Sequence, residues 1–338
     1  MTASLRVLAV TNLWPVGDSF RGIFVKEQVE ALRRLGVHVD VEVVAQERGK
    51  ADYFLAGQRV RKLVQQNQYD LIHVHYGMAS LAARFVHPDI PRVLSLYGSD
   101  INVGWQRAFT RLGKHGVAAR IYVSQNLVDN AGDPDGHVIA DGVDFTLFVP
   151  GDREQARAAF GLPAEEKVIL FGGHPANEVK GYDVFSDVLK ELSGRGYKVR
   201  ELVLAASNQP RSKVPLKFDA ADVLLFTSRK GSEGSPSVIK EATAMGLPVV
   251  TVNVGDAEKL LNGVTPSEVV DFPEPWGEDE SRAKLIRLLA DRTADVVVAA
   301  QQSKTQRSNG RERNSWLDSE RVAGQVIKVY RQVLGGNG

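Results

Sequence analysis

Two glutamates, Glu233 and Glu241, stand around a small turn that leads into a helical pattern. Ser235 is expected to cap this helix and Pro236 to occupy its first position, because these residue types are favoured there. The free amides of the helix start would then be available to a phosphate group. Glu241 follows Ser237 by four residues, so it lies one helical turn further along the same face.

This arrangement suggests a sugar nucleotide as the ligand. Carboxylates accept hydrogen bonds from paired hydroxyls, and helix starts attract phosphate. The ribose would then lie at Glu241, the diphosphate at the helix start and the sugar near Glu233. The alternative is that both acids are solvated or capping residues, which is the more frequent case for two isolated glutamates.

The elements that must position these residues follow a regular rhythm. Short β-rich runs alternate with amphipathic helical patterns, which is typical of βαβ units on a parallel sheet. A turn-rich segment, 141–152, interrupts the rhythm and indicates a connection between two domains. The strands are expected in two sets, at 5–11, 37–45, 70–75, 92–97 and 120–124, and at 167–173, 201–206, 222–228 and 248–252.

Polar and glycine-rich segments follow several of these strands. Open α/β sheets bind ligands beyond the carboxyl ends of their strands, and two such ends can face each other across a cleft. The sequence therefore predicts an α/β protein with two doubly wound, Rossmann-like domains that bind a ligand between them. The segments are 12–22, His75-Tyr76-Gly77, Tyr97-Gly98-Ser99-Asp100, Gly172-Gly173-His174 and 228–237.

Length and composition fit this organisation. A chain of 338 residues exceeds what one hydrophobic core usually supports, which favours two domains. The 42 Lys and Arg nearly cancel the 41 Asp and Glu, so no strong field favours nucleic acid as a partner. The chain has no cysteine, no signal-peptide pattern and no apolar run long enough for a membrane span. A cytoplasmic protein is expected.

Other motifs are missing or weak. There is no Gly-x4-Gly-Lys-Ser/Thr loop and no Gly-x-Gly-x2-Gly after a strand, which disfavours nucleoside triphosphatases and dehydrogenases. Asp133-Pro134-Asp135 imitates a metal-binding Asp-x-Asp, but its proline and flanking glycines predict a surface turn. The histidines lack the spacing of a zinc site. Neither a metal nor a cofactor is expected.

At four places the chain resembles the retaining GT-B glycosyltransferases of family 4, the glycosyl transferases group 1. The segment 233–241, Glu-Gly-Ser-Pro-Ser-Val-Ile-Lys-Glu, is similar to their Glu-x7-Glu motif. Residues 22–28 resemble the first glycine loop, 138–148 the hinge signature and 179–181 the lysine turn at the donor phosphate. These segments occur in the family's order over most of the chain.

The resemblance implies a GT-B fold with an acceptor-side domain at 1–148, a nucleotide-sugar-binding domain at 149–314 and a final helix, 315–338, that crosses back to the first domain. It implies a transferase that takes a hexose or N-acetylhexosamine from a UDP- or GDP-linked donor and retains the anomeric configuration without a metal. The acceptor would be a glycan or a lipid-linked sugar in cell-surface polysaccharide or glycoconjugate synthesis.

The resemblance also implies roles for individual residues. Glu241 would hold the ribose, Glu233 with the amides of Gly234 and Ser235 would address the donor sugar, and Lys180 would neutralise the departing diphosphate. Charge develops on the leaving phosphate, so a lysine and a helix start near it would stabilise the transition state. Further donor-side residues would be Gly22, Gly173, His174, Pro236 and Ser237, and the remaining catalytic candidates are His75, Tyr97 and Asp100.

Two questions stay open at this point. Relatives often have a histidine where this chain has Tyr97 to Asp100, so the acceptor-side role passes to Tyr97, to His75 or to neither. His75 fits equally well as a hydrogen-bonded histidine at a strand end. A sugar-nucleotide-binding module without turnover and a GT-B sugar-nucleotide epimerase are the alternative functions.

A last segment mixes aromatic and basic residues on the expected acceptor side. It contains Trp105, Arg107, Phe109, Arg111, Lys114 and His115. Such a helix can rest on an anionic membrane, which would suit a lipid-linked acceptor. A partly buried helix with a solvated face explains the same residues equally well.

Overall fold

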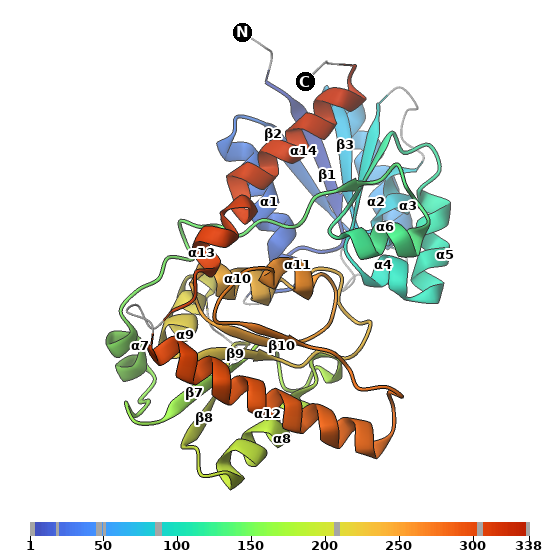
Figure 1. Cartoon of the computed structure of the whole chain (residues 1–338). Coiled ribbons are helices and arrows are strands. Elements are labelled where there is room, and N and C mark those ends of the chain that lie inside the picture. The colour runs from blue at the N-terminus through green and yellow to red at the C-terminus, as the bar shows by residue number, and fades with distance from the viewer. Residues whose placement is uncertain are drawn as a thin grey trace. The chain divides into compact units, whose positions relative to one another are not determined.

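The computed structural model describes residues 4–17, 20–44, 49, 52–84, 90–205, 210–302 and 307–335. The chain divides into two compact units (Figure 1). Unit 1 comprises Met1–Gly142 and Leu317–Gly338, and unit 2 comprises Val143–Trp316. These divisions fall six residues before and two residues after the domain ends expected from the sequence, 148 and 314.

Unit 1 contains a six-stranded parallel sheet with the order β2-β1-β3-β4-β5-β6. The chain starts at β1, adds β2 on one side and then β3 on the other, so the order reverses between β1 and β3. The five expected strands are confirmed, and the two-residue β6 was not predicted. The strands are β1 (Arg6–Thr11), β2 (His38–Val43), β3 (Leu71–His75), β4 (Arg92–Leu96), β5 (Ala119–Tyr122) and β6 (His137–Val138).

Helices cover both faces of this sheet. On one face α1 (Ile23–Arg34) and α14 (Ser319–Val333) pack together, and Figure 1 shows α14, in red, running along the unit beside β1 and β3. Both helices bury their apolar side chains in one cluster with the sheet, for example Leu32 and Val326. The opposite face carries α2 (Asp52–Gln66), α3 (Ser80–Ala83) and α6 (Gln125–Ala131). The remaining helices are η2 (Gly77–Ala79), α4 (Ser99–Asn102) and α5 (Gly104–Gly113).

Unit 2 contains a five-stranded parallel sheet with the order β11-β10-β9-β7-β8. The order reverses between β7 and β9, so the carboxyl ends of these two strands form the position where doubly wound sheets bind ligands. The strands are β7 (Lys167–Phe171), β8 (Val199–Val203), β9 (Val223–Phe226), β10 (Val249–Val252) and β11 (Glu268–Val270). Four of them were expected, whereas β11 was not. The expected strand ends Ala45 and Ala206 lie outside the described residues.

The helices of unit 2 surround its sheet. The longest, α12, begins at Asp279 and ends at Gln302, and it lies beside α8 (Tyr182–Gly194). After α12 ends at Gln302, the short α13 follows at Gly310–Arg313. The other helices are α7 (Arg153–Ala159), η3 (Glu178–Lys180), η4 (Arg211–Lys213), α9 (Val214–Ala220), α10 (Ser237–Ala244), α11 (Ala257–Leu261) and α13 (Gly310–Arg313), with η5 (Ser315–Leu317) at the unit boundary.

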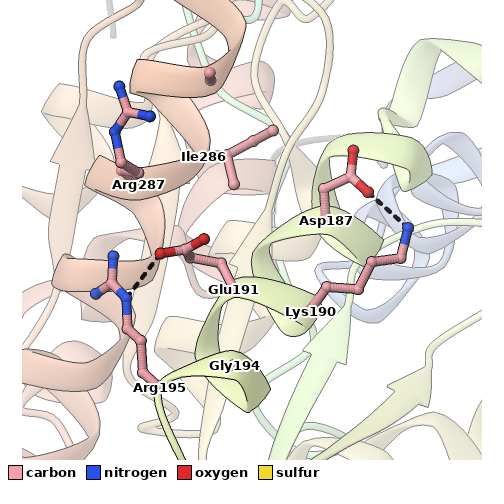
Figure 2. A pocket seen from close by; sticks show the side chains of 8 residues that line it. Asp187, Lys190, Glu191, Gly194, Arg195, Ile286 and Arg287 are labelled. Carbon is pink, nitrogen blue, oxygen red and sulfur yellow. Dashed lines mark hydrogen bonds and ion pairs between the residues drawn. The ribbon is translucent and has the colours of Figure 1, made fainter.

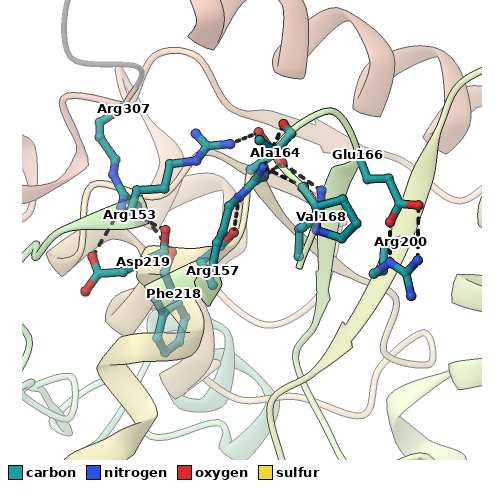
Figure 3. Close-up of polar contacts among 12 residues, drawn as sticks. Arg153, Arg157, Ala164, Glu166, Val168, Arg200, Phe218, Asp219 and Arg307 are labelled. Carbon is teal, nitrogen blue, oxygen red and sulfur yellow. Dashed lines mark hydrogen bonds and ion pairs between the residues drawn. The ribbon is translucent and has the colours of Figure 1, made fainter. Parts of the chain in front are cut away.

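Buried ion pairs tie the first helix of unit 2 to its sheet (Figure 3). Asp222, immediately before β9, accepts hydrogen bonds from both Arg153 and Arg157 of α7 and from the backbone amide of Val168. Asp219 binds Arg307 and the amide of Gly151. Because these carboxylates are buried and paired with arginines from distant segments, removing either partner would leave a buried charge uncompensated. This polar cluster is structural.

Candidate active site

The donor-side candidates of unit 2 meet at the carboxyl ends of β7 and β9. Lys180 ends the short helix η3, and its Nζ lies 2.7 Å from Oε1 of Glu233. The same oxygen accepts a hydrogen bond from Ser228 Oγ at 2.6 Å. The two side chains of the ion pair are only 26% and 13% exposed. Glu233 is therefore held in place by two partners, Lys180 and Ser228.

The side chain of Lys180 packs directly against Gly173. A Cβ atom on Gly173 would lie 2.7 Å from Cγ of Lys180, closer than side-chain carbons approach one another. The Nζ of Lys180 also lies 5.4 Å from the centre of the Phe226 ring, at the end of β9. His174, the next residue after Gly173, is exposed and uses its Nδ1 to accept a hydrogen bond from the amide of Ala176 at 3.1 Å. Its role toward a donor phosphate remains a prediction.

The start of α10 differs from the sequence prediction. Ser235 was expected to cap the helix, but Pro236 occupies the N-cap position and Ser237 begins the helix. The Ser235 hydroxyl instead donates to Oδ2 of Asp256 at 2.9 Å, in the loop that follows β10. Burial raises the pKa of Asp256, and its Oδ1 has no hydrogen-bond partner among the described residues. Asp256 thus holds the loop of Gly234 and Ser235 by a contact that the local sequence does not reveal.

Glu241, the second acid of the motif, is also engaged. Its Oε1 accepts a hydrogen bond from Arg211 at 2.8 Å, and only 6% of the glutamate side chain is exposed. Arg211 comes from η4, after β8, a segment in which the sequence pattern indicated no site residue. The apolar side chains of Val238 and Ala242 in α10, and that of Met245 after it, are buried.

In unit 1 the acceptor-side candidates gather where β3 and β4 end. The Nδ1 of His75 lies 2.6 Å from the Tyr97 hydroxyl, and its Nε2 is buried without a partner among the described residues. Burial lowers the pKa of His75 to about 3 and raises that of Tyr97 well above its ordinary value. Both groups are therefore neutral near pH 7. Tyr76, the residue after His75, adopts a φ of 81°, the strained conformation that often marks functional positions.

A second histidine extends this network. The ring of His73 lies 4.0 Å from that of His75, measured between ring centres. His73 Nδ1 contacts the Tyr330 hydroxyl of α14 at 2.6 Å, and its Nε2 contacts Ser95 Oγ at 2.8 Å. Burial and the neighbouring His75 lower the pKa of His73. The sequence analysis did not select His73, Ser95 or Tyr330.

Asp100 is fully buried, and its carboxylate is committed to the backbone. It accepts hydrogen bonds from the amides of Tyr97 at 3.1 Å, Gly98 at 2.8 Å and Gly77 at 3.4 Å. Burial raises its pKa to about 6, against the opposing effect of these amides. The geometry makes Asp100 an anchor for the loops after β3 and β4.

Gly22 lies after β1, at the start of α1. Its φ is 74°, and an added Cβ would lie 2.2 Å from the carbonyl carbon of Leu13. Only glycine fits this turn, because side chains both disfavour the conformation and have no space there. The turn folds the segment after β1 back onto itself beside the sheet's switch point.

Two further features of the described residues are occupied by contacts of their own. Asp133, expected in a surface turn, is buried and bound by Lys114 at 2.7 Å and by Arg120 at 2.7 Å. A groove between α8 and α12 is lined by acids and bases that already pair with each other, such as Glu191 with Arg195 (Figure 2). Within the described part of the chain, no three His, Asp or Glu side chains form a potential metal cluster. None of the described helices is apolar and long enough to cross a membrane.

Comparison with known proteins agrees with this geometry. Residues 22–147 match the model of Glycosyltransferase Family 4, and residues 166–291 match that of Glycosyl transferases group 1. TuaC of Bacillus subtilis, named for teichuronic acid biosynthesis, is 30% identical over 235 residues, 61% of this chain and 59% of TuaC. D-inositol 3-phosphate glycosyltransferase 1 of Catenulispora acidiphila is 25% identical over 80% of this chain and 74% of its own length.

Solved structures show the same fold. Sucrose-phosphate synthase of Thermosynechococcus elongatus superimposes with a TM-score of 0.77 at 17% identity, covering 98% of this chain and all of the other. Anabaena HepE, solved with UDP-glucose, gives 0.67 at 18% identity over 97% of this chain and all of HepE. Two parallel α/β sheets of this kind define the GT-B class of glycosyltransferases. Within that class the chain belongs to the glycosyl transferases group 1.

Proposed function

We propose that this protein transfers a sugar from a nucleoside diphosphate donor to an acceptor in polysaccharide or glycoconjugate synthesis. The observation that carries the proposal is the cluster of Lys180, Ser228 and Glu233 at the switch point of the unit 2 sheet. A cation, a hydroxyl and an acid meet there beside the start of an eight-residue helix. These are the groups that stabilise a departing diphosphate and orient a sugar.

In the proposed reaction the bond from the anomeric carbon to the β-phosphate oxygen breaks, and its electron pair stays on the diphosphate. The oxygen of the acceptor hydroxyl forms the new bond to the anomeric carbon, and its proton passes to the departing diphosphate. Lys180 and the amides at the start of α10 stabilise this charge. Glu233 must then leave its contact with Lys180, at least in part, and its carboxylate becomes available to the hydroxyls of the sugar. The ribose binds Glu241. The donor carries UDP or GDP; structures of HepE with UDP and with UDP-glucose support the uridine nucleotide.

The proposal includes retention of the anomeric configuration without a metal. It is supported by the spacing of Glu233 and Glu241, which resembles that of retaining family members. On the acceptor side, His75 and Tyr97 are neutral and hydrogen-bonded, so they are suited to orient an acceptor hydroxyl rather than to carry charge. Asp100 positions the loop of Tyr97 through its backbone amides.

A lipid-linked acceptor and contact with the inner face of a membrane complete the proposal. In α5 the side chains of Trp105, Phe109 and Leu112 are 57%, 41% and 53% exposed, so the apolar face of this helix points outward. Trp105 and Phe109 lie edge to face, 6.3 Å apart. Between Asp100 and Asp129 the chain has four Lys or Arg and no acid. Lys114 and Arg120 bind Asp133, so Arg107 and Arg111 are the cations proposed to meet an anionic surface. The alternative, a partly buried helix with a solvated face, also fits α5, because the helix buries Thr110 and Gly113.

The test is release of nucleoside diphosphate from a panel of UDP- and GDP-sugars, with and without membrane lipids carrying sugar acceptors. We expect release with one donor, stimulation by an acceptor, and loss in Glu233→Ala. Proton NMR of the product would show whether the configuration is retained. Binding of the nucleotide without turnover under any acceptor would indicate a binding module, and release of an epimer or free sugar without acceptor would indicate an epimerase.

A further inference from the structure

Arg211 and Glu241 form a nearly buried ion pair that the sequence motif does not predict. The guanidinium Nη2 lies 2.8 Å from Oε1, and the two side chains are 17% and 6% exposed. An ion pair in such a position is costly to desolvate and is weak evidence for a purely stabilising role. The pair therefore calls for a functional explanation.

The position of the guanidinium is fixed from a second side. Its central carbon lies 4.7 Å from the ring centre of Phe148, within the range of a cation–π contact. Phe148 itself is fully buried and packs edge to face against Phe218 at 6.0 Å. Arg211 thus reaches Glu241 from a rigid support.

This contact uses one of the two carboxylate oxygens. Oε1 of Glu241 is bound to Arg211, whereas no hydrogen bond to Oε2 is formed by any described residue. The arginine therefore restrains one oxygen of the carboxylate, and the other acceptor oxygen remains available. This restraint limits the directions in which the second oxygen can point.

We propose that Arg211 is a positioning residue that presents Oε2 of Glu241 to one ribose hydroxyl and makes the site selective for ribonucleoside over deoxyribonucleoside diphosphates. The inference rests on the proposed function, in which Glu241 holds the donor ribose. A site built to hydrogen-bond a hydroxyl rejects the analogue that lacks it, because the buried acceptor is then left unpaired. Without Arg211 the carboxylate rotates and this discrimination is lost.

A direct contact of Arg211 with a phosphate would behave differently. Loss of a phosphate contact weakens binding of ribose and deoxyribose nucleotides by the same factor. Loss of a positioning residue removes the preference between them. The ratio of the two affinities therefore separates the roles, and a merely structural arginine would leave this ratio unchanged.

The experiment is calorimetric titration of UDP, GDP and their 2′-deoxy and 3′-deoxy analogues into the full-length protein. Wild type is expected to bind the preferred diphosphate about tenfold more tightly than at least one deoxy analogue. Arg211→Met and Glu241→Ala should each reduce this ratio of affinities to near one. The double variant should have the same ratio as either single variant. Arg211→Lys keeps the charge without the planar group and tests the same ratio should Arg211→Met fold poorly. Arg195→Met, at the residue that caps the carboxyl end of α8, is the matched control because Arg195 also pairs with a carboxylate, that of Glu191.

The inference is overturned when the arginine variants keep the wild-type ratio, or when ribose and deoxyribose nucleotides weaken equally. Either result leaves the proposed function intact, because the wild type still binds the diphosphate. Failure of the wild type to bind any nucleoside diphosphate overturns the proposed function, and this inference with it.

Discussion

Lys180 and Glu233 form an ion pair, with Nζ 2.7 Å from Oε1. They come from the two segments that flank the switch point of the unit 2 sheet, one after β7 and the other after β9. In the proposed function Lys180 contacts the donor diphosphate, so Glu233 competes with the diphosphate for the lysine. Donor binding in the proposed function thus exchanges one anion for another.

The lysine is expected to dominate affinity for the diphosphate. Lys180→Ala should weaken binding of the preferred nucleoside diphosphate about tenfold or more, because a charge-assisted hydrogen bond contributes about 1.5–3 kcal/mol. Calorimetry on purified protein measures this. Lys190→Ala, a surface lysine of α8 that pairs with Asp187, serves as control and should bind as the wild type does. Equal affinities in the two variants would remove Lys180 from the site.

Glu233 is expected to affect turnover and binding in opposite directions. Glu233→Gln keeps the shape of the side chain and an acceptor for Ser228 but removes the charge that competes for Lys180. We predict equal or tighter binding of the diphosphate, with transfer reduced about 100-fold. Parallel calorimetry and initial-rate measurements would show this split. Transfer at the wild-type rate would contradict a catalytic role for Glu233.

The turn at Gly22 offers a matched pair of glycines. Gly22 and Gly17 both have positive φ, at 74° and 58°, but only Gly22 has another atom where a Cβ would lie. Gly17→Ala should cost about 1 kcal/mol of unfolding free energy, from backbone conformation alone. Gly22→Ala should cost clearly more, because the backbone of Leu13 must move. Denaturant unfolding of both variants tests this, and equal losses would contradict the close approach.

The buried histidine predicts a pH dependence of stability. Burial holds the pKa of His75 at about 3, whereas the unfolded chain titrates near 6.5. The contribution of the neutral His75 to the free energy of unfolding is complete above pH 6.5 and is lost as the pH falls toward 3. At pH 5 the loss is about 2 kcal/mol. Asp100, with its pKa raised to about 6, has the opposite sign: its contribution is complete below pH 4 and is lost as the pH rises through 6.

The effects of His75 and Asp100 on the free energy of unfolding partly cancel in the wild type. The test therefore compares the pH dependence of the wild type with that of a variant that lacks His75. His75→Asn should lose less stability than the wild type between pH 7 and pH 5, by about 2 kcal/mol, although it starts lower. Urea unfolding at both pH values measures it. Parallel changes in the two proteins would show that His75 is not held neutral.

The exposed face of α5 predicts binding to anionic vesicles. The double variant Trp105→Ser and Phe109→Ser should reduce co-sedimentation with vesicles that contain anionic lipid, and Arg111→Glu should reduce it by charge alone. Neither change should affect nucleotide binding. Val298→Ser, at an exposed apolar position of α12, is the control. Vesicle binding that survives in both α5 variants would place the membrane contact elsewhere.

The sequence predicted the elements with clear periodicity and missed the shortest ones. All nine expected strands are present, because each combines a β-rich run with flanking turn residues. The strands β6 and β11 contain two and three residues, too few for a pattern. Their positions depend on pairing with β5 and β10 rather than on their own residues.

The candidate site was predictable only where its residues share a local motif. Lys180, Glu233 and Glu241 were selected from the sequence, whereas Ser228, Arg211 and Asp256 were not. Ser235 was assigned to a helix cap because Ser before Pro favours one, yet Asp256 from another loop takes its hydroxyl. Contacts between distant segments, such as Arg211 with Glu241, depend on the assembled sheet and leave no local signal.

The most direct test of the account is thermal unfolding of the wild type and Lys180→Ala with UDP, GDP, ADP or dTDP, because a ligand of the native state raises the melting temperature. The account predicts that one diphosphate stabilises the wild type and the Lys190→Ala control, and that this stabilisation is absent or much smaller in Lys180→Ala. No shift with any diphosphate, or an equal shift in Lys180→Ala, would contradict it.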